Sequence, residues 1–263
     1  MRTASTSCDR STGTRSGGMQ RRATLLCAIL PLLFLPAFAL SQAAEPDTSL
    51  ARVNADPLFP FSREIEAFAK AEEKDPAVPD AALFLGSSSI RLWDIHSSFP
   101  DVGTVNRGFG GATTRDVLHY YPRLLPHAKP RSVIVYVGEN DLAGGADPQN
   151  VAREVLALLK RLRADYPKAH IAYLSLKPSP IRWTLWPKMA AVNMTVAARA
   201  RVQRFDYVDV GRTLLAPDGL PDASLFRKDG LHMNARGYDR WTRVVDAYLD
   251  RMQIADSRAV ATS

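Results

Sequence analysis

The sequence predicts an α/β fold in which helices cover both faces of a five-stranded parallel sheet. Short apolar runs alternate along the chain with helical patterns, which is typical of consecutive βαβ units. The runs are rich in β-branched residues and hydrophobic at nearly every position, as expected of strands buried on both faces. Of the 263 residues, 46% are hydrophobic and 23% are charged. This is an ordinary globular balance, and the chain is long enough for one domain of about 200 residues.

The first 43 residues are expected to be a secretory signal peptide and not part of the fold. Arg21 and Arg22 precede the apolar segment "ATLLCAILPLLFLPAFAL", and small residues follow it up to Ala43. This order of basic, apolar and small-residue regions is typical of signal peptides; Met19 is an alternative start. Two prolines interrupt the apolar run, so an uncleaved membrane anchor is the less favoured alternative. We therefore expect a periplasmic or secreted protein of a bacterial envelope, with no stable membrane span after cleavage.

Most of the net charge belongs to this segment. The whole chain has a formal net charge of +7, but residues 1–43 contain five arginines and one aspartate. The remaining chain has 29 basic and 26 acidic residues, a net charge of +3, which gives no reason to expect a nucleic-acid partner. Both cysteines, Cys8 and Cys27, lie in the same segment. The mature protein is therefore expected to have neither a disulfide nor a thiol nucleophile.

The first elements of the domain, which is expected over residues 61–252, follow a linker at 44–60 that contains three prolines. A helix is predicted from Ser62, which would cap it, because Ile65 and Phe68 have helical spacing. The β-branched and apolar runs then predict the sheet. The five predicted strands are 81–85, 102–106, 132–137, 171–176 and 205–210.

Three helices are predicted in the second half of the chain. One begins after Asp147, an N-cap residue that precedes Pro148 at the first helical position. The others are expected over 187–203 and 234–250, where apolar residues recur at helical spacing. The chain from 253 to 263 is small and polar and is expected to be a disordered tail.

Polar and glycine-rich segments lie at the ends of the predicted elements. In open parallel α/β sheets, sites form beyond the carboxyl ends of the strands, so these segments are expected to meet. Together they offer hydroxyl nucleophiles, backbone and amide donors for an oxyanion, and a histidine with an aspartate to orient it. Each segment alone is typical of a turn or a helix cap. The segments are "GSSS" (86–89), "NRGFGGATT" (106–114), "GEND" (138–141) and "DGLHMN" (229–234).

In this order the four segments resemble the sequence blocks of the SGNH hydrolases, also called GDSL-type esterases and lipases. The resemblance covers roughly residues 80–250. It implies a three-layer sandwich with a flavodoxin-like sheet. It also implies that Ser88 is the nucleophile, His232 the general base and Asp229 the residue that orients it. The implied oxyanion hole consists of the backbone N–H groups of Ser88 and Gly111 and the side-chain amide of Asn140.

One position departs from the family pattern, because Ser87 replaces the aspartate of the G-D-S block. That aspartate is not a member of the triad. Ser87 is instead predicted to cap the following helix, as aspartate would, and Ser89 to be a turn or cap residue.

The resemblance implies a serine esterase that acts through an acyl-enzyme, and the expected signal peptide would make it an exported one. The sequence has no long apolar lid segment, so small acyl esters, acetyl esters among them, are the preferred substrates. No cofactor and no metal are expected. The ester substrate would be a small molecule or a glycan, since export favours envelope substrates. Two alternatives remain: acyl transfer to a glycan in place of water, and a non-catalytic envelope binding protein with the same fold.

Five further residues are candidate substrate contacts. Arg107, Phe109 and Asp141 lie within or beside the polar segments. Trp183 and Trp186 follow the fourth predicted strand, at the same edge of the sheet. They are expected either to form the wall of a binding cleft or to cover the core.

Overall fold

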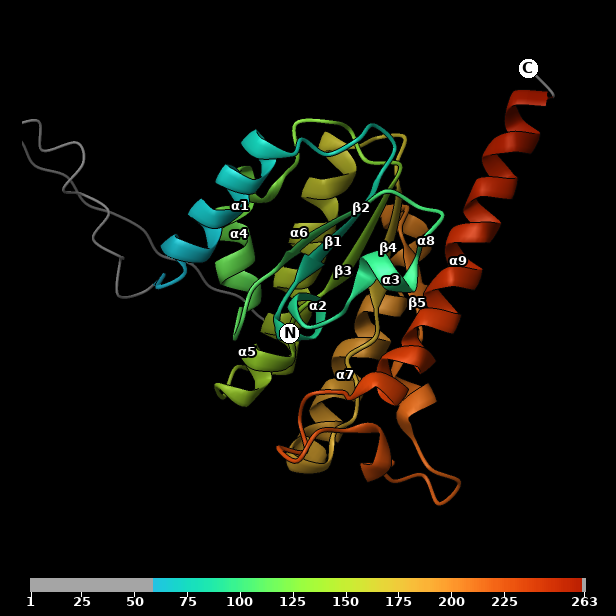
Figure 1. Cartoon of the computed structure of the whole chain (residues 1–263). Coiled ribbons are helices and arrows are strands. Elements are labelled where there is room, and N and C mark those ends of the chain that lie inside the picture. Colours follow the sequence, from blue (N-terminus) through green and yellow to red (C-terminus); the bar gives the residue numbers. More distant parts are fainter. Residues whose placement is uncertain (1–58, 262–263) are drawn as a thin grey trace, which may run out of the picture. The chain divides into compact units, whose positions relative to one another are not determined.

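The computed structural model of the protein describes residues 59–261. It contains a five-stranded sheet with the strand order β2-β1-β3-β4-β5 (Figure 1). All strand pairs are parallel, so the predicted three-layer α/β fold is confirmed. The predicted signal peptide and nearly all of the predicted linker lie outside the described residues. The strands are β1 (Ala82–Gly86), β2 (Thr104–Gly108), β3 (Ser132–Tyr136), β4 (His170–Leu174) and β5 (Asp206–Val208).

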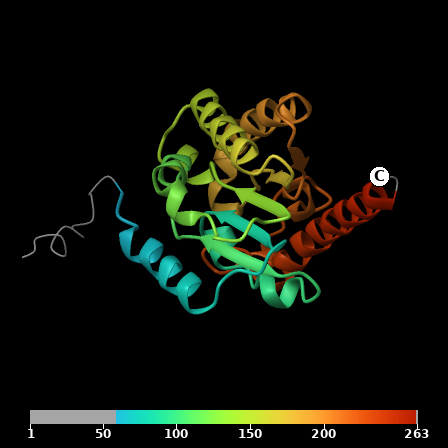
Figure 2. The same ribbon diagram turned by 90° about the horizontal axis from the view of Figure 1, so that it is seen from above.

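Helices connect the strands and cover both faces of the sheet. The longer helices α4, α6 and α7 lie on one face, and α9 lies on the other with the short α3 beside it (Figure 2). The α-helices are α1 (Ser62–Lys74), α2 (Ser88–Arg91), α3 (Ile95–Ser98), α4 (Thr114–Leu124), α5 (Glu139–Ala143), α6 (Pro148–Asp165), α7 (Trp186–Ala197), α8 (Ala200–Gln203) and α9 (Ala235–Ala261). Three 3-10 helices are η1 (Pro180–Leu185), η2 (Gly211–Leu214) and η3 (Ala223–Leu225).

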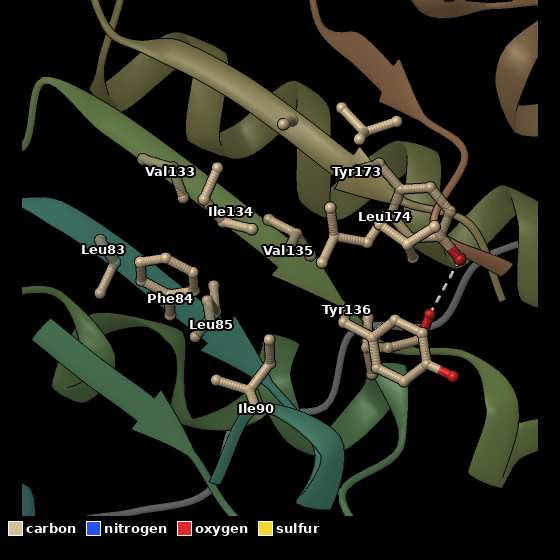
Figure 3. Packing of buried hydrophobic residues seen from close by; sticks show 14 of the residues in the cluster. Leu83, Phe84, Leu85, Ile90, Val133, Ile134, Val135, Tyr136, Tyr173 and Leu174 are labelled. Carbon is tan, nitrogen blue, oxygen red and sulfur yellow. Dashed lines mark hydrogen bonds between the residues drawn. The ribbon is translucent and has the colours of Figure 1, made fainter. Parts of the chain in front are cut away.

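Both faces of the central strands are buried, because successive side chains point to opposite helical layers (Figure 3). On the α9 side, Phe84 of β1 contacts Trp93 and Phe99, with ring centroids 5.5 and 5.4 Å apart. Tyr136 of β3 contacts Trp241 of α9 at 5.0 Å. The contact of Tyr136 fixes the start of α9 against the carboxyl end of β3.

The strand order changes direction between β1 and β3, since β2 lies on one side of β1 and β4 lies beyond β3. Connections that leave such neighbouring strands diverge to opposite sides and open a crevice at their carboxyl ends. Ser88 follows β1 and Asn140 follows β3. The fold therefore places two of the four polar segments directly at this crevice.

Several helix boundaries differ from the sequence predictions. The cap of α6 is as predicted, because Asp147 accepts the backbone N–H groups of Gln149 and Asn150. The predicted helix 187–203 is instead two helices, α7 and α8, and ends where Arg204 adopts a left-handed conformation with φ 57°. The predicted serine cap of α1 is wrong: Phe61 occupies the cap position, and Ser62 is the first helical residue.

The predicted disordered tail is also wrong as far as Ala261, because α9 continues through it. Alanine is the best helix former, and it recurs at 255, 259 and 261. Asp256 of this extension pairs with His170 at the start of β4, with 2.8 Å between Oδ1 and Nε2. Within residues 59–261, none of the helices combines the length and apolar character needed to cross a membrane.

Candidate active site

Ser88 lies at a sharp turn between β1 and α2. Gly86 has φ +152°, and a Cβ at this position would be only 1.9 Å from the carbonyl oxygen of Tyr136, so the turn requires glycine. Ser87 follows in an extended conformation at the cap position of α2. Ser88 is the first residue of that helix, half-buried at the end of the sheet.

The structure places three of the predicted residues in one hydrogen-bonded line. The Nε2 atom of His232 is 3.1 Å from the Oγ atom of Ser88. On the other side of the ring, Nδ1 is 2.7 Å from Oδ2 of Asp229. Ser88 and His232 are 144 positions apart in the sequence, so this contact depends on the whole fold.

Asp229 is bound by its own loop as well as by His232. Its Oδ1 atom accepts the backbone N–H groups of Leu231 and His232, each at 2.9 Å. The hydrogen bond from the His232 side chain, assisted by these N–H groups, holds the pKa of Asp229 well below its usual range. The carboxylate is therefore ionised and fixed in orientation, and its second oxygen is directed at the imidazole.

Three donors predicted for an oxyanion lie on the neighbouring loops. As the first residue of α2, Ser88 has a backbone N–H with no intrahelical partner. Gly111 has φ +79°, a left-handed conformation that favours glycine, and a Cβ there would meet nothing within 4 Å. The Nδ2 atom of Asn140 donates to the carbonyl of Ala112 at 3.0 Å, one residue beyond Gly111. This bond uses one of the two amide protons and leaves the second available.

Comparison with known proteins agrees with this architecture. The profile of the GDSL-like lipase/acylhydrolase family matches residues 91–240, more than half of the chain. The chain belongs to the GDSL-like lipase/acylhydrolase family. The matched span begins three residues after Ser88 and does not include this serine. Among curated protein sequences, none matches the chain at a significant level.

Solved structures resemble this GDSL-like chain in fold. A protein from Streptococcus pneumonia is 21% identical, with a TM-score of 0.64, over 71% of this chain and 92% of that one. A GDSL-like lipase from Bacteroides thetaiotaomicron is 18% identical, with a TM-score of 0.60, over 71% and 97%. The psychrotrophic esterase EstA from Pseudoalteromonas sp. is 18% identical, with a TM-score of 0.52, over 65% and 98%.

The two serines beside Ser88 have structural roles in this GDSL-like protein. Ser87 occupies the cap position of α2, but its side chain makes no capping hydrogen bond, so the predicted side-chain cap is wrong. Its backbone N–H instead donates to the carbonyl of Tyr136 at 3.1 Å. Ser89 is buried, and its carbonyl accepts the hydroxyl of Tyr238 at 3.0 Å. The bonds made by Ser87 and Ser89 fix the backbone on both sides of Ser88.

Two predicted substrate contacts are wrong because their side chains are buried away from the crevice. Phe109 is 0% exposed and contacts the ring of Phe61 at 5.0 Å. Arg107 is buried on β2, where it pairs with Glu72 of α1 and lies over the ring of Phe68. The sequence places both residues beside the glycine loop, but the pleat of β2 and the turn after it direct them into the helical layer.

Asp141 is also wrong as a substrate contact, because it is buried and has a structural role. Its carboxylate accepts the backbone N–H of Thr114, at 3.0 and 3.1 Å, and so satisfies the first turn of α4. Burial raises the pKa of Asp141 above its ordinary value, although the bond from Thr114 opposes this. The interaction joins the loop after β3 to the loop after β2.

The two predicted tryptophans stack on each other, with ring centroids 5.9 Å apart. Trp186 packs against the core and contributes to a 290 Å³ cavity with Tyr207 and Met194. None of the four polar segments borders this cavity. Of the two predicted roles, Trp186 therefore has the one of covering the core. Trp183 is half-buried and directly follows Arg182, and its contact with substrate remains a prediction.

The sequence interpretation overlooked three charged residues behind this site. Glu139 and Lys177 are buried, and Lys177 is among the most fully buried side chains of the described chain. Lys177 and Arg182 both donate to the carboxylate of Glu139, at 3.0 Å. Burial would raise the pKa of Glu139, but the two cations and the hydroxyl of Tyr136 outweigh it and lower the pKa. The available signal was a lysine three residues after the end of β4, whose last four residues are all buried.

The described histidine and carboxylate side chains do not form a metal site: within residues 59–261, no group of three or more potential ligands is arranged to hold an ion.

Proposed function

We propose that the protein is an exported serine esterase that hydrolyses small acyl esters, acetyl esters among them. The observation that carries this proposal is the hydrogen-bonded line from Ser88 Oγ through the His232 ring to Asp229. Membership of the GDSL-like lipase/acylhydrolase family supports ester hydrolysis. The proposed export rests on the sequence of residues 1–43, and the periplasm or the exterior of a bacterial cell is the proposed location.

In the proposed acylation step, Ser88 Oγ attacks the ester carbonyl carbon while its proton passes to Nε2 of His232. Asp229 accepts the Nδ1–H of the ring and stabilises the imidazolium that forms. The carbonyl oxygen becomes an oxyanion, which the N–H groups of Ser88, Gly111 and Asn140 stabilise by hydrogen bonds. The intermediate then collapses: the bond to the leaving alcohol breaks, and His232 returns the proton to that alcohol.

Deacylation repeats these roles with water in place of the serine. His232 removes a proton from water, which attacks the acyl carbon, and the bond to Ser88 breaks as the serine recovers its proton. If a glycan hydroxyl took the place of this water, the same residues would transfer the acyl group. Hydrolysis is the version proposed here, because the matched family consists of lipases and acylhydrolases.

A fluorophosphonate probe tests the proposed nucleophile. Such a probe forms a phosphorus–oxygen bond with an activated serine and releases fluoride, and the related EstA structure is described as inhibited by monoethylphosphonate. We expect one labelled site in wild type and none in Ser88→Ala. Ser89→Ala is the matched control, because Ser89 is adjacent and buried, and it should label normally. An unlabelled wild type would favour the non-catalytic alternative, and persistent labelling of Ser88→Ala would exclude Ser88.

A panel of p-nitrophenyl esters tests the proposed substrate class. We expect kcat/KM to be highest for acetyl and to fall with increasing acyl length. A preference for long chains would contradict the small-acyl proposal. Free acetate and acetylated glycan, measured together with a glycan acceptor present, separate hydrolysis from transfer. Trp183→Ala is expected to change the leaving-group selectivity, and unchanged selectivity would exclude Trp183 from the binding cleft.

A further inference from the structure

The charged cluster behind the site consists of Glu139, Lys177 and Arg182, and it contacts both halves of the proposed machinery. Glu139 begins α5 directly before Asn140. Lys177 follows β4, and Arg182 lies in η1. The three residues therefore come from the loops after β3 and β4, at the edge of the sheet where Ser88 lies.

Arg182 contacts the proposed oxyanion donor directly. Its Nη1 atom donates to Oδ1 of Asn140 at 3.1 Å and to Oε1 of Glu139 at 3.0 Å. The first bond fixes which end of the Asn140 amide is the acceptor. The Nδ2 end must then point the other way, toward Ala112 and the space beside Gly111. A rotated amide would present an oxygen to the oxyanion and would also lose both bonds.

Lys177 contacts the loop that carries Asp229 and His232. Its Nζ atom donates to the carbonyl of Leu231, the residue before His232, at 3.1 Å. The same ammonium group donates to both carboxylate oxygens of Glu139, at 3.3 and 3.0 Å. The backbone adds a parallel link, because the N–H of Ile181 donates to the carbonyl of Gly230 at 3.1 Å.

The composition of the cluster is unusual for a purely structural element. Burying charged groups is costly, and apolar residues of similar volume often stabilise a core equally well. Here the buried carboxylate of Glu139 pairs with two cations. Each cation also donates a further hydrogen bond: Arg182 to Asn140, and Lys177 to the carbonyl of Leu231.

We propose that Glu139, Lys177 and Arg182 are positioning residues for the reaction: Arg182 fixes the Asn140 amide, and Lys177 fixes the backbone before His232. This inference rests on the proposed function for its kinetic consequences. Its structural content, the orientation of Asn140 and of the 229–232 loop, can be measured without any substrate.

The kinetic test uses p-nitrophenyl acetate and a double-mutant cycle. Arg182→Met is expected to lower kcat by about 100-fold with KM changed less than three-fold, since misplacing a reacting group by about 1 Å has an effect of this size. In an Asn140→Ala background the same substitution should lower kcat by less than about three-fold, because its target is gone. A purely structural arginine would give the same loss in both backgrounds. Such additivity would overturn the proposal for Arg182.

Control variants separate positioning from folding. Arg163→Met is the matched control: Arg163 donates to the carbonyls of Arg204 and Ala169, remote from the four polar segments, and its loss should leave kcat unchanged. Arg182→Lys retains the charge without the planar fork and should give an intermediate kcat. If Lys177→Met does not fold, the double variant Glu139→Gln with Lys177→Met serves in its place, because it removes one buried charge of each sign and leaves only the partly exposed Arg182.

A ¹H–¹⁵N spectrum provides the readout that needs no activity. The side-chain signals of Asn140 are assigned by their loss in Asn140→Ala, and they should shift or broaden in Arg182→Met but not in Arg163→Met. The backbone signal of His232 should respond likewise to Lys177→Met. Unchanged signals would overturn the proposal even if the wild type hydrolysed no ester. An active wild type with unchanged signals and unchanged kcat in these variants would overturn it and leave the esterase proposal intact.

Discussion

Replacing Asp229 with asparagine tests the proposed mechanism at one hydrogen bond. Oδ1 of Asp229 accepts two backbone N–H groups, and Oδ2 faces Nδ1 of His232. In Asp229→Asn the single amide oxygen must remain with the two N–H donors, because an NH₂ group there would oppose them. The amide NH₂ then faces Nδ1 of His232. That nitrogen becomes an acceptor, and the proton of the neutral ring moves to Nε2.

A proton on Nε2 prevents His232 from accepting the proton of Ser88. In a serine protease the equivalent change lowers kcat by about 10⁴, which corresponds to about 5 kcal/mol of activation free energy. We expect a loss of the same order here, because the two backbone donors determine the orientation of the amide. KM should change little, since neither Asp229 oxygen faces the substrate side of the ring.

The assay is steady-state hydrolysis of p-nitrophenyl acetate, with thermal melts to show that each variant folds. Asp222→Asn is the matched control, because Asp222 also accepts a backbone N–H, from Ser224, in the same part of the chain. It should retain kcat within about two-fold, as expected for a substitution remote from the chemistry. An Asp229→Asn variant that retains more than a tenth of wild-type kcat would refute the argument from the tautomer.

Three further predictions concern the scaffold. Gly86→Ala should destabilise the fold by at least about 3 kcal/mol in urea denaturation, because its Cβ would overlap the carbonyl of Tyr136 and φ is positive. The Cβ of Gly111→Ala has no atom within 4 Å, so this variant should lose only about 1–2 kcal/mol of unfolding free energy. Equal losses in the Gly86 and Gly111 variants would contradict this reasoning. The pKa of Glu139 is lower in the folded protein than in the unfolded chain, so its ionised carboxylate stabilises the fold at pH values above the unfolded-state pKa. This contribution is lost as the pH falls through the folded-state pKa. The urea midpoint should therefore decline less on acidification in Glu139→Gln than in wild type, and parallel declines would exclude a lowered pKa. Phe109→Ala should cost about 3–5 kcal/mol with KM unchanged, whereas a raised KM would place Phe109 at the substrate.

The sheet was predictable because apolar runs mark its strands, and in four of the five strands a glycine ends or follows the run. The weakest prediction was the second strand. Its true range, Thr104–Gly108, includes three polar residues, Thr104, Asn106 and Arg107. Pairing with β1 determines this range, and no local pattern reports such pairing. The length of α9 was missed because polar composition was taken as disorder, although alanine recurs through that segment.

The sequence predicts which residues of the candidate site lie at the carboxyl edge of the sheet, because they directly follow strands. It does not predict the direction of their side chains. Ser88 and Asn140 belong to segments that the parallel topology brings to one edge. Arg107 and Phe109 belong to the same edge, but contacts with α1, distant in sequence, determine where they point. The links from Lys177 to Leu231 and from Arg182 to Asn140 each span more than 40 positions, so only the folded chain shows them.

The 144-residue separation of Ser88 and His232 also determines when during its production the protein can become reactive. A growing chain presents Ser88 first, and His232 emerges only 144 residues later. Domains fold as units during synthesis, and here the unit is not complete until α9 covers its face of the sheet. Prematurely terminated chains that lack residue 229 onward would contain the proposed nucleophile without its proposed base. Under the proposed mechanism, acyl-transfer chemistry is therefore confined to chains that have been synthesised and folded beyond residue 232.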